Sequence, residues 1–339
     1  MLEYKLDKSA FHEKIGQIID LQGSSPDLND IIRGLIFIAV GLSENEISRN
    51  DLKTLYSAFR EMRQAFEFFA PFTAIKKVSV FGSARTLPAD LIYAHAADFS
   101  RKMTRAGFMV ITGAGDGIMR AVQGGAGREK SFGLNIILPF EQAANEFIEN
   151  DPKLITFKYF FIRKLFFVKE ANALAFFPGG FGTHDEGFET LTLLQTGKCD
   201  PSPVVFIDAP GGSHWKHWFS YVNDRLLAKG LISPEDINLF KITDNVAEAV
   251  YEITHFYQNY HSMQFIDDHS VIRLKQPLRD TQLEKLNDHF SDIIVKGKIV
   301  QSEPPPMAQL AFQFNRRNFG RLRALINAIN DFSIGVEKE

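Results

Sequence analysis

Short apolar runs alternate with helical stretches from residue 77 to residue 243, and this alternation limits the possible folds more than any other feature. Within each run the apolar residues are continuous, which is typical of strands covered on both faces. We therefore predict a doubly wound, Rossmann-like α/β fold, in which helices flank a parallel sheet. The runs are KVSVFG (77–82), FMVITG (108–113), LNIILP (134–139), ALAFFPG (173–179), PVVFID (203–208) and NLFKIT (238–243).

Two further segments flank this domain, which we place at residues 71–260. Residues 1–70 show a helical pattern, with apolar positions three and four apart, that ends abruptly at Pro71. Residues 261–339 predict a small β-α-β-β-α appendage whose first strand is MQFIDDHSVIRL. Successive prolines in SEPPPM (302–307) place a loop inside this appendage. The chain is thus expected to have a helical N-terminal extension, an α/β domain and a small α+β appendage.

The composition is that of a globular protein and argues against several kinds of partner. Of the 339 residues, 45% are hydrophobic and 23% are charged. The formal net charge of -3 gives no general attraction to nucleic acid or to anionic membranes. The most apolar helical stretch, residues 31–42, is too short to span a bilayer and contains Arg33. We expect neither a membrane nor a nucleic-acid partner.

The single cysteine and the first residues bear on the cellular location. Cys199 alone cannot form an internal disulfide or a metal site of several thiolates, and it fits a reducing compartment. The first residues include acidic side chains and lack the apolar run and cleavage site of a signal peptide. A cytoplasmic location is the prediction.

Three glycine-containing loops follow predicted strands: FGSAR (81–85), TGAGDGIM (112–119) and PGGFGT (178–183). In an open parallel sheet, ligands bind beyond the carboxyl ends of the strands, where helix N-termini present free N–H groups. Glycine lets the backbone approach a ligand closely, although any such turn can use glycine for geometry alone. Taken together, the loops favour phosphate binding over a purely structural role. The glycines concerned are Gly113, Gly115, Gly117, Gly179, Gly180 and Gly182.

A dinucleotide-binding fold is the competing interpretation of these loops. The spacing of GAGDGI is G-x-G-x-G, not G-x-G-x-x-G, and it follows the second predicted strand, not the first. Glu141, after the third strand, could take the place of the acid that binds ribose in such folds. The match to a nicotinamide-binding oxidoreductase is therefore imperfect.

Glu186 has two interpretations that the sequence leaves open. Thr183 and Glu186 have the spacing of a T-x-x-E capping box, which stabilises a helix start by about 0.5 to 2 kcal/mol without any catalysis. Alternatively, Glu186 is a catalytic carboxylate beside an anion-binding loop. In that case we expect the positive end of the helix dipole to keep it ionised.

Two basic segments also have alternatives. Arg163 and Lys164 lie among aromatic residues in KYFFIRKLFFVKEANA, either as the solvent-exposed heads of an amphipathic helix or as phosphate ligands. The tail segment FNRRNFGRLR (314–323) carries four arginines. A solvated helix face is the favoured interpretation, and a regulatory phosphate or nucleotide site is the alternative.

At this point the motifs resemble those of a known family. PGGFGTHDE resembles the PGGxGTxxE motif of the LONELY GUY (LOG) family, once labelled "lysine decarboxylase-like", and FFIRK resembles the RK element that accompanies it. FGSAR, TGAGDGIM and LNIILPFEQAANEF are similar to further family segments. The resemblance covers about residues 75 to 260. A pyridoxal-dependent decarboxylase would require a Schiff-base lysine and a partner for the pyridinium nitrogen, and the predicted fold gives no support to that label.

The resemblance implies an enzyme that hydrolyses the N-glycosidic bond of a nucleoside 5′-monophosphate, AMP-like or a cytokinin ribotide, to free base and ribose 5-phosphate. It implies a homodimer or higher homo-oligomer, with the helix of Arg163 near the shared surface, and neither a metal nor a cofactor. A nucleotide or cofactor carrier without turnover remains the alternative. By position, the resemblance makes Arg163 and Glu186 catalytic and assigns phosphate or nucleotide binding to Ser83, Gly113, Gly115, Gly117, Glu141, Lys164, Gly179, Gly180, Gly182 and Thr183.

Two departures from the family pattern leave base and sugar preference open. The family's T-L-E-E reads Thr183-His184-Asp185-Glu186, and its Y-G-G-G loop reads Thr112-Gly113-Ala114-Gly115. Neither departure removes an implied catalytic group.

Overall fold

The computed structural model describes residues 13–17, 26–42, 46–139, 143–302 and 307–332. The chain forms two compact units, Met1–Gln64 and Ala65–Glu339, which are described separately. In the first unit the described secondary structure is helical: a short helix at 13–17, α2 (Pro26–Gly41) and the first part of α3 (Arg49–Phe69). The predicted helical extension is confirmed for these residues. Among the described residues, no helix is long and apolar enough to cross a bilayer.

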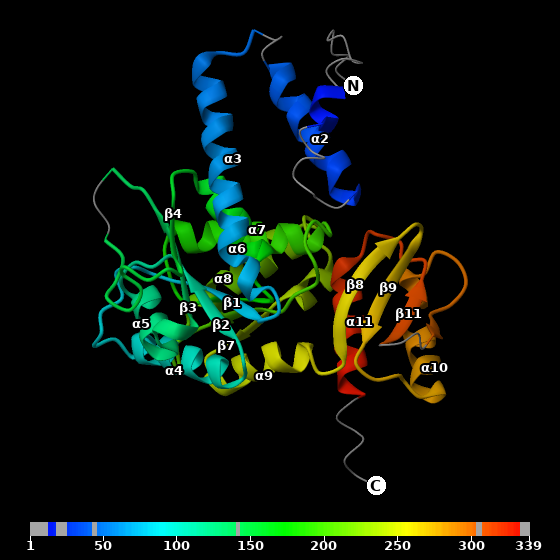
Figure 1. The fold of residues 1–339 in the computed structure, drawn as a ribbon. Helices are drawn as coiled ribbons and strands as arrows, with labels where there is room; N and C mark the ends of the chain where they lie inside the picture. Colours follow the sequence, from blue (N-terminus) through cyan, green and yellow to red (C-terminus); the bar gives the residue numbers. More distant parts are fainter. Residues whose placement is uncertain (1–12, 18–25, 43–45, 140–142, 303–306, 333–339) are drawn as a thin grey trace. The chain divides into compact units, whose positions relative to one another are not determined.

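The second unit contains the predicted parallel sheet (Figure 1). It has seven strands in the order β4-β3-β2-β1-β5-β6-β7, and all pairings are parallel. The doubly wound fold is therefore confirmed, although the strand β4 was not predicted. The strands are β1 (Lys77–Phe81), β2 (Met109–Thr112), β3 (Ser131–Ile136), β4 (Leu154–Phe157), β5 (Ala173–Phe176), β6 (Val204–Ile207) and β7 (Lys241–Thr243).

Helices cover both faces of this sheet. Alternate residues of each strand point to opposite faces of the sheet. The side chains of the continuous apolar runs are therefore buried on both faces. Val78, Val110 and Ala175 pack in one core with α4, α5 and α9. On the other face Phe81 lies 4.9 Å from Phe167 of α6, between ring centroids. The helices are α4 (Leu91–Arg105), α5 (Ile118–Ala126), α6 (Phe160–Lys169), α7 (Phe181–Gln195), α8 (His214–Tyr221) and α9 (Val246–Phe256).

Shorter helical segments connect these elements. They are the 3₁₀ helices Ala70–Phe72, Arg128–Lys130, Pro234–Leu239 and Ser291–Ile293, and the π-helical segment Val222–Leu227.

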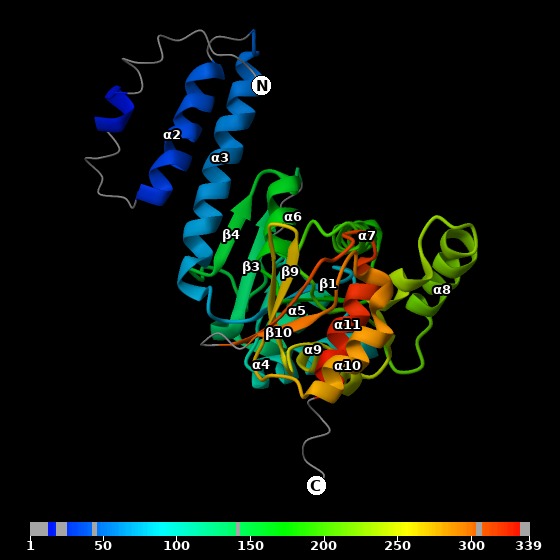
Figure 2. The same cartoon turned by 90° about the vertical axis from the view of Figure 1, so that its right-hand side faces the viewer.

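The C-terminal part forms a four-stranded antiparallel sheet in the order β10-β11-β9-β8, with two helices (Figure 2). The single strand predicted over MQFIDDHSVIRL is wrong, because the chain turns back at Asp267, which adopts a positive φ of 51°. The result is the hairpin of β8 and β9. The elements are β8 (Tyr260–Ile266), β9 (His269–Leu274), α10 (Asp280–His289), β10 (Val300–Ser302), β11 (Ala308–Phe312) and α11 (Phe319–Asp331).

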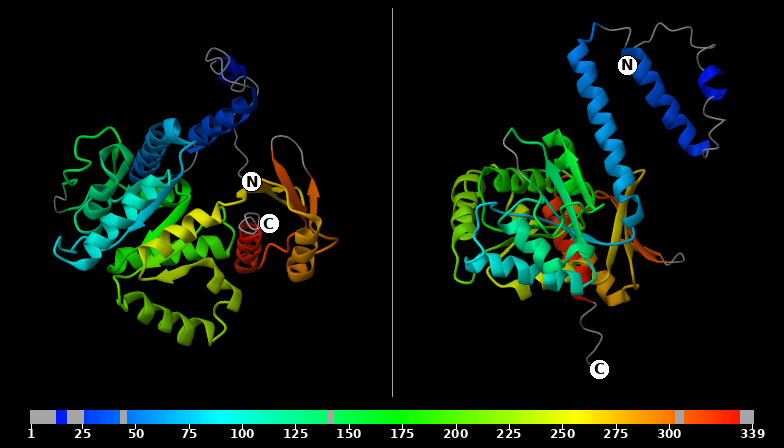
Figure 3. Two further views of the ribbon diagram at one scale, coloured as in Figure 1. Left: turned by 90° about the horizontal axis from the view of Figure 1, so that it is seen from below. Right: turned by 60° about the vertical axis from the view of Figure 1, so that its left-hand side comes forward.

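The helix α11 joins this sheet to the α/β domain. It packs against α7 and α9 on one side and β8 on the other (Figure 3). One hydrophobic core continues from Val78 of β1 through Phe256 to Leu322 of α11. The division of the chain into three domains stays a prediction.

The basic tail segment is largely used inside the fold. Arg316 donates a hydrogen bond to the carbonyl of Asp267 at 2.7 Å, and Arg321 binds Asp292 at 3.1 Å. Arg323 is buried and pairs with Glu252. The solvated face predicted for this segment is therefore wrong at Arg323, because the helix turns that side chain into the domain. The regulatory nucleotide site at this segment stays a prediction.

Candidate functional site

Ser83 holds together the three loops that follow β1, β2 and β5. Its N–H donates to the carbonyl of Pro178 at 3.0 Å, and its carbonyl accepts from the N–H of Ile118 at 3.0 Å. Gly117 lies against this carbonyl with a positive φ of 64°, and a Cβ added there would be 2.2 Å from the Ser83 oxygen. The three predicted loops are thus brought together at the carboxyl edge of the sheet.

The two glycines of the PGGFGT loop differ in their surroundings. A Cβ on Gly179 would lie 2.1 Å from Oγ1 of Thr183 and 3.1 Å from the backbone nitrogen of Ser83. A Cβ on Gly180 or Gly182 would meet no atom within 4 Å. Gly179 is therefore required for packing between loops, whereas Gly180 and Gly182 leave bare backbone on the pocket side.

Asn145 fixes the TGAGDG loop from outside it. Its Nδ2 group donates to the carbonyls of Ala114 at 3.1 Å and Gly115 at 2.9 Å, and to Oε1 of Gln123 at 2.6 Å. Ala114 has a positive φ of 63°, so the loop depends on such outside bonds to hold this backbone. Sequence reasoning did not single out Asn145, although it lies in the segment LNIILPFEQAANEF.

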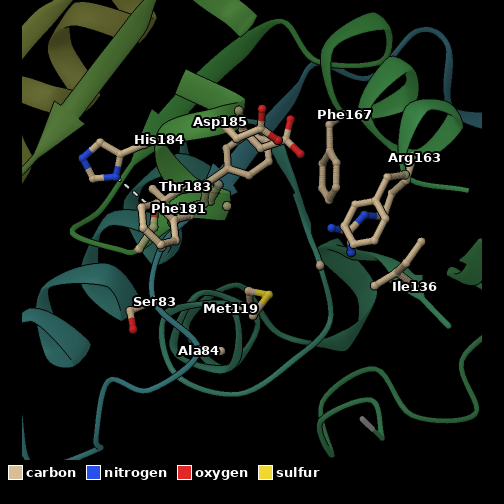
Figure 4. A pocket seen from close by; sticks show the side chains of 18 of the residues that line it. Ser83, Ala84, Met119, Ile136, Arg163, Phe167, Phe181, Thr183, His184 and Asp185 are labelled. Carbon is tan, nitrogen blue, oxygen red and sulfur yellow. Dashed lines mark hydrogen bonds between the residues drawn. The ribbon is translucent and has the colours of Figure 1, made fainter. Parts of the chain in front are cut away.

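The loops and helices enclose a cavity of about 1000 Å³ (Figure 4). Seven of the predicted residues line it, from four segments of the chain: Ser83, Gly113, Arg163, Gly180, Gly182, Thr183 and Glu186. Gly115, Gly117, Gly179 and Lys164 do not line it; the three glycines support the loops. Glu141 lies outside the described residues. Residues that sequence reasoning missed also line the cavity: Arg85, Met119, Asn135, Ile136, Phe160 and Phe167.

The helix α7 begins earlier than the capping box requires. Its N-cap is Gly180, so Thr183 and Glu186 occupy its third and sixth positions. Both side chains are buried. The capping-box interpretation is therefore wrong, because Glu186 lies in the second turn and cannot reach back to the N-cap N–H.

Glu186 is a buried carboxyl group within the cavity. Its side chain is 6% exposed, and Oε2 has no hydrogen-bond partner among the described residues. Burial raises the pKa of Glu186 to about 7, even though the charges of Lys164 and Arg163 oppose the shift. The helix dipole therefore does not keep the pKa of this group at its ordinary value, since the loss of hydration outweighs the favourable charges. Whether the ionised or the protonated form acts stays a prediction.

Arg163 faces the same cavity from α6. Its guanidinium carbon lies 5.1 Å from the ring centroid of Phe160 and 5.5 Å from that of Phe167. Burial lowers the pKa of Arg163, Glu186 partly offsets this, and Nε has no partner among the described residues. The interpretation of Arg163 as a solvated head is wrong, because aromatic rings hold it at the pocket wall.

Lys164 turns away from this cavity. It pairs with Asp185 at 2.9 Å and with Glu189 at 2.7 Å. Its ammonium group therefore acts on Glu186 through its charge and not by lining the pocket. Its assignment to phosphate binding stays a prediction.

The cavity combines a protonatable carboxyl, a guanidinium and bare backbone at a helix start. Such backbone N–H groups bind anions, and an acid with a pKa near neutrality can transfer a proton. Among the described residues, no cluster of His, Cys, Asp and Glu side chains is suited to hold a metal ion.

Comparisons with known proteins agree with this arrangement. Residues 117–253 match the family described as possible lysine decarboxylase. The chain is 26% identical over 174 residues, 51% of its own length and 90% of the relative, to a cytokinin riboside 5′-monophosphate phosphoribohydrolase of Mycobacterium tuberculosis. Over these residues the α/β domain is similar to proteins of the LOG family.

Solved structures similar to the α/β domain include the protein TM1055 and the molybdenum cofactor carrier protein of Chlamydomonas reinhardtii. TM1055 is 23% identical, with 52% of this chain and 96% of that chain covered and a TM-score of 0.38. The carrier protein is 18% identical, with 52% and 94% covered and a TM-score of 0.35.

The pyridoxal chemistry that the family description suggests does not fit this α/β domain. Such a cofactor is held by a lysine as a Schiff base. Among the described residues the arginines that line the cavity are Arg85 and Arg163, and no lysine lines it.

Proposed function

We propose that the protein hydrolyses the N-glycosidic bond of a nucleoside 5′-monophosphate, AMP-like or a cytokinin ribotide, to free base and ribose 5-phosphate. One observation carries this proposal: Glu186 and Arg163 line the same cavity as the bare backbone of Gly180 and Gly182. The activity named for the mycobacterial relative supports it.

The phosphate of the substrate would bind at the start of α7. Gly180 and Gly182 lie at the N-cap and second positions, where the helix leaves N–H groups free. Arg163 would contact a phosphate or sugar oxygen with two parallel N–H groups. Binding energy from the phosphate then positions the ribosyl C–N bond.

Glu186 would serve as the proton donor to the departing base. Burial already brings the pKa of Glu186 to about 7, and the negative charge of a bound phosphate raises it further. The protonated form then predominates near neutral pH, and protonating the base makes it a better leaving group as the ribose becomes oxocarbenium-like. This replaces the ionised role expected from the sequence.

A product assay tests the proposal directly. The full chain is incubated with AMP, GMP, CMP and isopentenyl-AMP, and released base is measured by chromatography. We expect release from at least one of them. Intact nucleotides across the whole panel would remove the proposal.

Binding of a larger nucleotide or cofactor without turnover is the second candidate. The cavity volume of about 1000 Å³ favours it, because this lies at the upper end for small-molecule sites. Recovery of an unhydrolysed ligand after long incubation with the protein would support this candidate over the first.

The assembly and location stay predictions. We propose a homodimer or higher homo-oligomer, with α6 near the shared surface, because Phe161 on that helix is 59% exposed. Light scattering on the purified chain tests this, and a monomer at micromolar concentration would contradict it. A cytoplasmic location and the lack of nucleic-acid, membrane, metal and cofactor partners are retained as expectations.

A further inference from the structure

A second cavity, of about 660 Å³, lies between α6, the loop from α7 to β6, and the strand β8. Lys169 lines it from α6, Lys198 and Cys199 line it from the loop, and His261 and Met263 line it from β8. None of these five residues lines the catalytic cavity. The second cavity is therefore a separate site, formed where the C-terminal sheet meets the α/β domain.

Cationic side chains outnumber anionic ones around this cavity. Three lysines and His261 line it, together with the carboxylates of Glu189 and Asp200. Glu189 is already paired with Lys164, at 2.7 Å. Lys198, in contrast, is exposed and forms no ion pair or side-chain hydrogen bond with any described residue. Lys169 is paired with Glu170 at 2.9 Å, and Asp200, like Lys198, forms no ion pair with any described residue. Lysines on this wall outnumber carboxylates by three to two.

Further cations stand beside the β8 side of the cavity. Burial lowers the pKa of His261, and the charges of Lys76, Arg273 and Lys275 lower it further. Lys275 is itself affected, because burial and the charge of Lys76 lower its pKa. These positive groups repel one another, and an anion bound among them would reduce that repulsion.

The remaining wall is apolar. Val168, Leu193, Tyr260 and Met263 line the same space, and the last two are buried. The volume lies within the range of sites for small organic molecules. An occupant that matches both parts of the wall has an anionic head and an apolar body.

We propose that this cavity binds a small organic anion, a phosphate monoester or a carboxylate with an aromatic or aliphatic body, whose head contacts Lys198 and Lys169. Lys164 connects the two cavities, since it lines this one and pairs with Asp185, which lines the other. The proposal does not depend on the reaction proposed above.

Cys199 is a specific reporter for this cavity, because it is the single cysteine of the chain and lines the wall. Burial raises the pKa of its thiol to about 12, so alkylation is slow and can be followed over hours. The full chain is treated with iodoacetamide at pH 8.5, and the modified peptide is quantified by mass spectrometry. Phenyl phosphate and benzoate are the anionic probes, and phenol is the neutral control.

We expect at least one of the two anions to slow alkylation severalfold, while phenol does not. The probe that protects identifies the head group. The protection should be lost in a Lys169→Ala/Lys198→Ala double variant. It should persist in a matched double variant at two exposed lysines that line neither cavity, Lys229→Ala/Lys296→Ala.

A variant in the first cavity distinguishes binding in the second cavity from binding at the glycine loops. In Arg163→Lys the protection of Cys199 should be unchanged, because that side chain lines only the first cavity. Lys198→Ala alone provides the comparison if the double variant is unstable. The proposal is overturned if neither anion protects, if phenol protects equally, or if the lysine variants retain protection.

Discussion

Glu186 and Arg163 line one cavity from successive helices, and burial shifts the pKa of each toward its uncharged form. The charge of each residue partly offsets the pKa shift that burial causes in the other. Neither Oε2 of Glu186 nor Nε of Arg163 has a hydrogen-bond partner among the described residues. Two buried, incompletely bonded groups of opposite charge are costly to keep in a fold, which favours a role in binding or catalysis.

The stability of the protein should depend on pH through Glu186. Its folded-state pKa is raised from 4.5 to about 7, so the folded chain holds a proton that the unfolded chain releases between these values. Stability is therefore lost as pH rises through this window. Glu186→Gln should remove the loss and raise the free energy of unfolding at pH 8 by up to about 3 kcal/mol, with little change at pH 4.5.

Urea unfolding of both proteins at the two pH values measures this difference. Glu129→Gln, at an exposed position outside the cavity, is the matched control and should show no such pH-dependent gain. The same Glu186→Gln variant should release no base. Equal stability of variant and wild type at pH 8 would contradict a buried, half-protonated carboxyl.

The activity should also depend on pH through this group. If Glu186 donates a proton to the base, kcat/KM falls as pH rises through about 7, because the free protein loses the active protonated form. A profile of kcat/KM between pH 5 and 9 checks this. A profile that instead rises through this range would assign the working role to the ionised carboxylate.

The guanidinium of Arg163 should not be replaceable by an ammonium group. Arg163→Lys keeps a positive charge but loses the planar fork held between Phe160 and Phe167. We expect kcat/KM to fall by about 10²-fold, as for the loss of one oriented donor. Steady-state kinetics measure it, with the exposed Arg105→Lys as a control of unchanged activity. Wild-type kinetics in Arg163→Lys would show that the contact is not bidentate.

The sequence predicted the fold and the convergence of the three glycine loops, for physical reasons. Buried parallel strands have a continuous apolar pattern, and glycine loops mark the carboxyl edge of the sheet. The start of α7 was predicted wrongly, and the raised pKa of Glu186 was not foreseen. The helix start depends on Gly180 taking the N-cap position, and the pKa depends on burial by distant segments. Asn145 donates a hydrogen bond to the carbonyl of Gly115, which is 30 residues away in the sequence, and no local sequence pattern predicts such a contact.

Arg323 should contribute to stability and not to activity. It is fully buried, pairs with Glu252, and donates to the carbonyl of Ser202 at 3.2 Å. Arg323→Ala leaves the partly exposed Glu252 carboxylate and the carbonyl of Ser202 without this partner, so we expect a loss of about 1–3 kcal/mol in the free energy of unfolding. Arg317→Ala, at an exposed position of the same segment, should be neutral. Equal effects of the two substitutions, measured by urea unfolding, would contradict the burial of Arg323.

Two neighbouring glycines of the PGGFGT loop should respond differently to the same added methyl group. In Gly179→Ala the new Cβ would lie 2.1 Å from Oγ1 of Thr183 and 3.1 Å from the backbone nitrogen of Ser83. The loop after β5 must then move away from the loop after β1, which costs about 1–3 kcal/mol. In Gly180→Ala the methyl meets no atom within 4 Å, and the backbone φ of -88° suits alanine. Thermal unfolding of the two variants should therefore show a lowered Tm for Gly179→Ala and a Tm near wild type for Gly180→Ala. If both variants unfold like wild type, the contact of Gly179 with Thr183 does not hold the loops together.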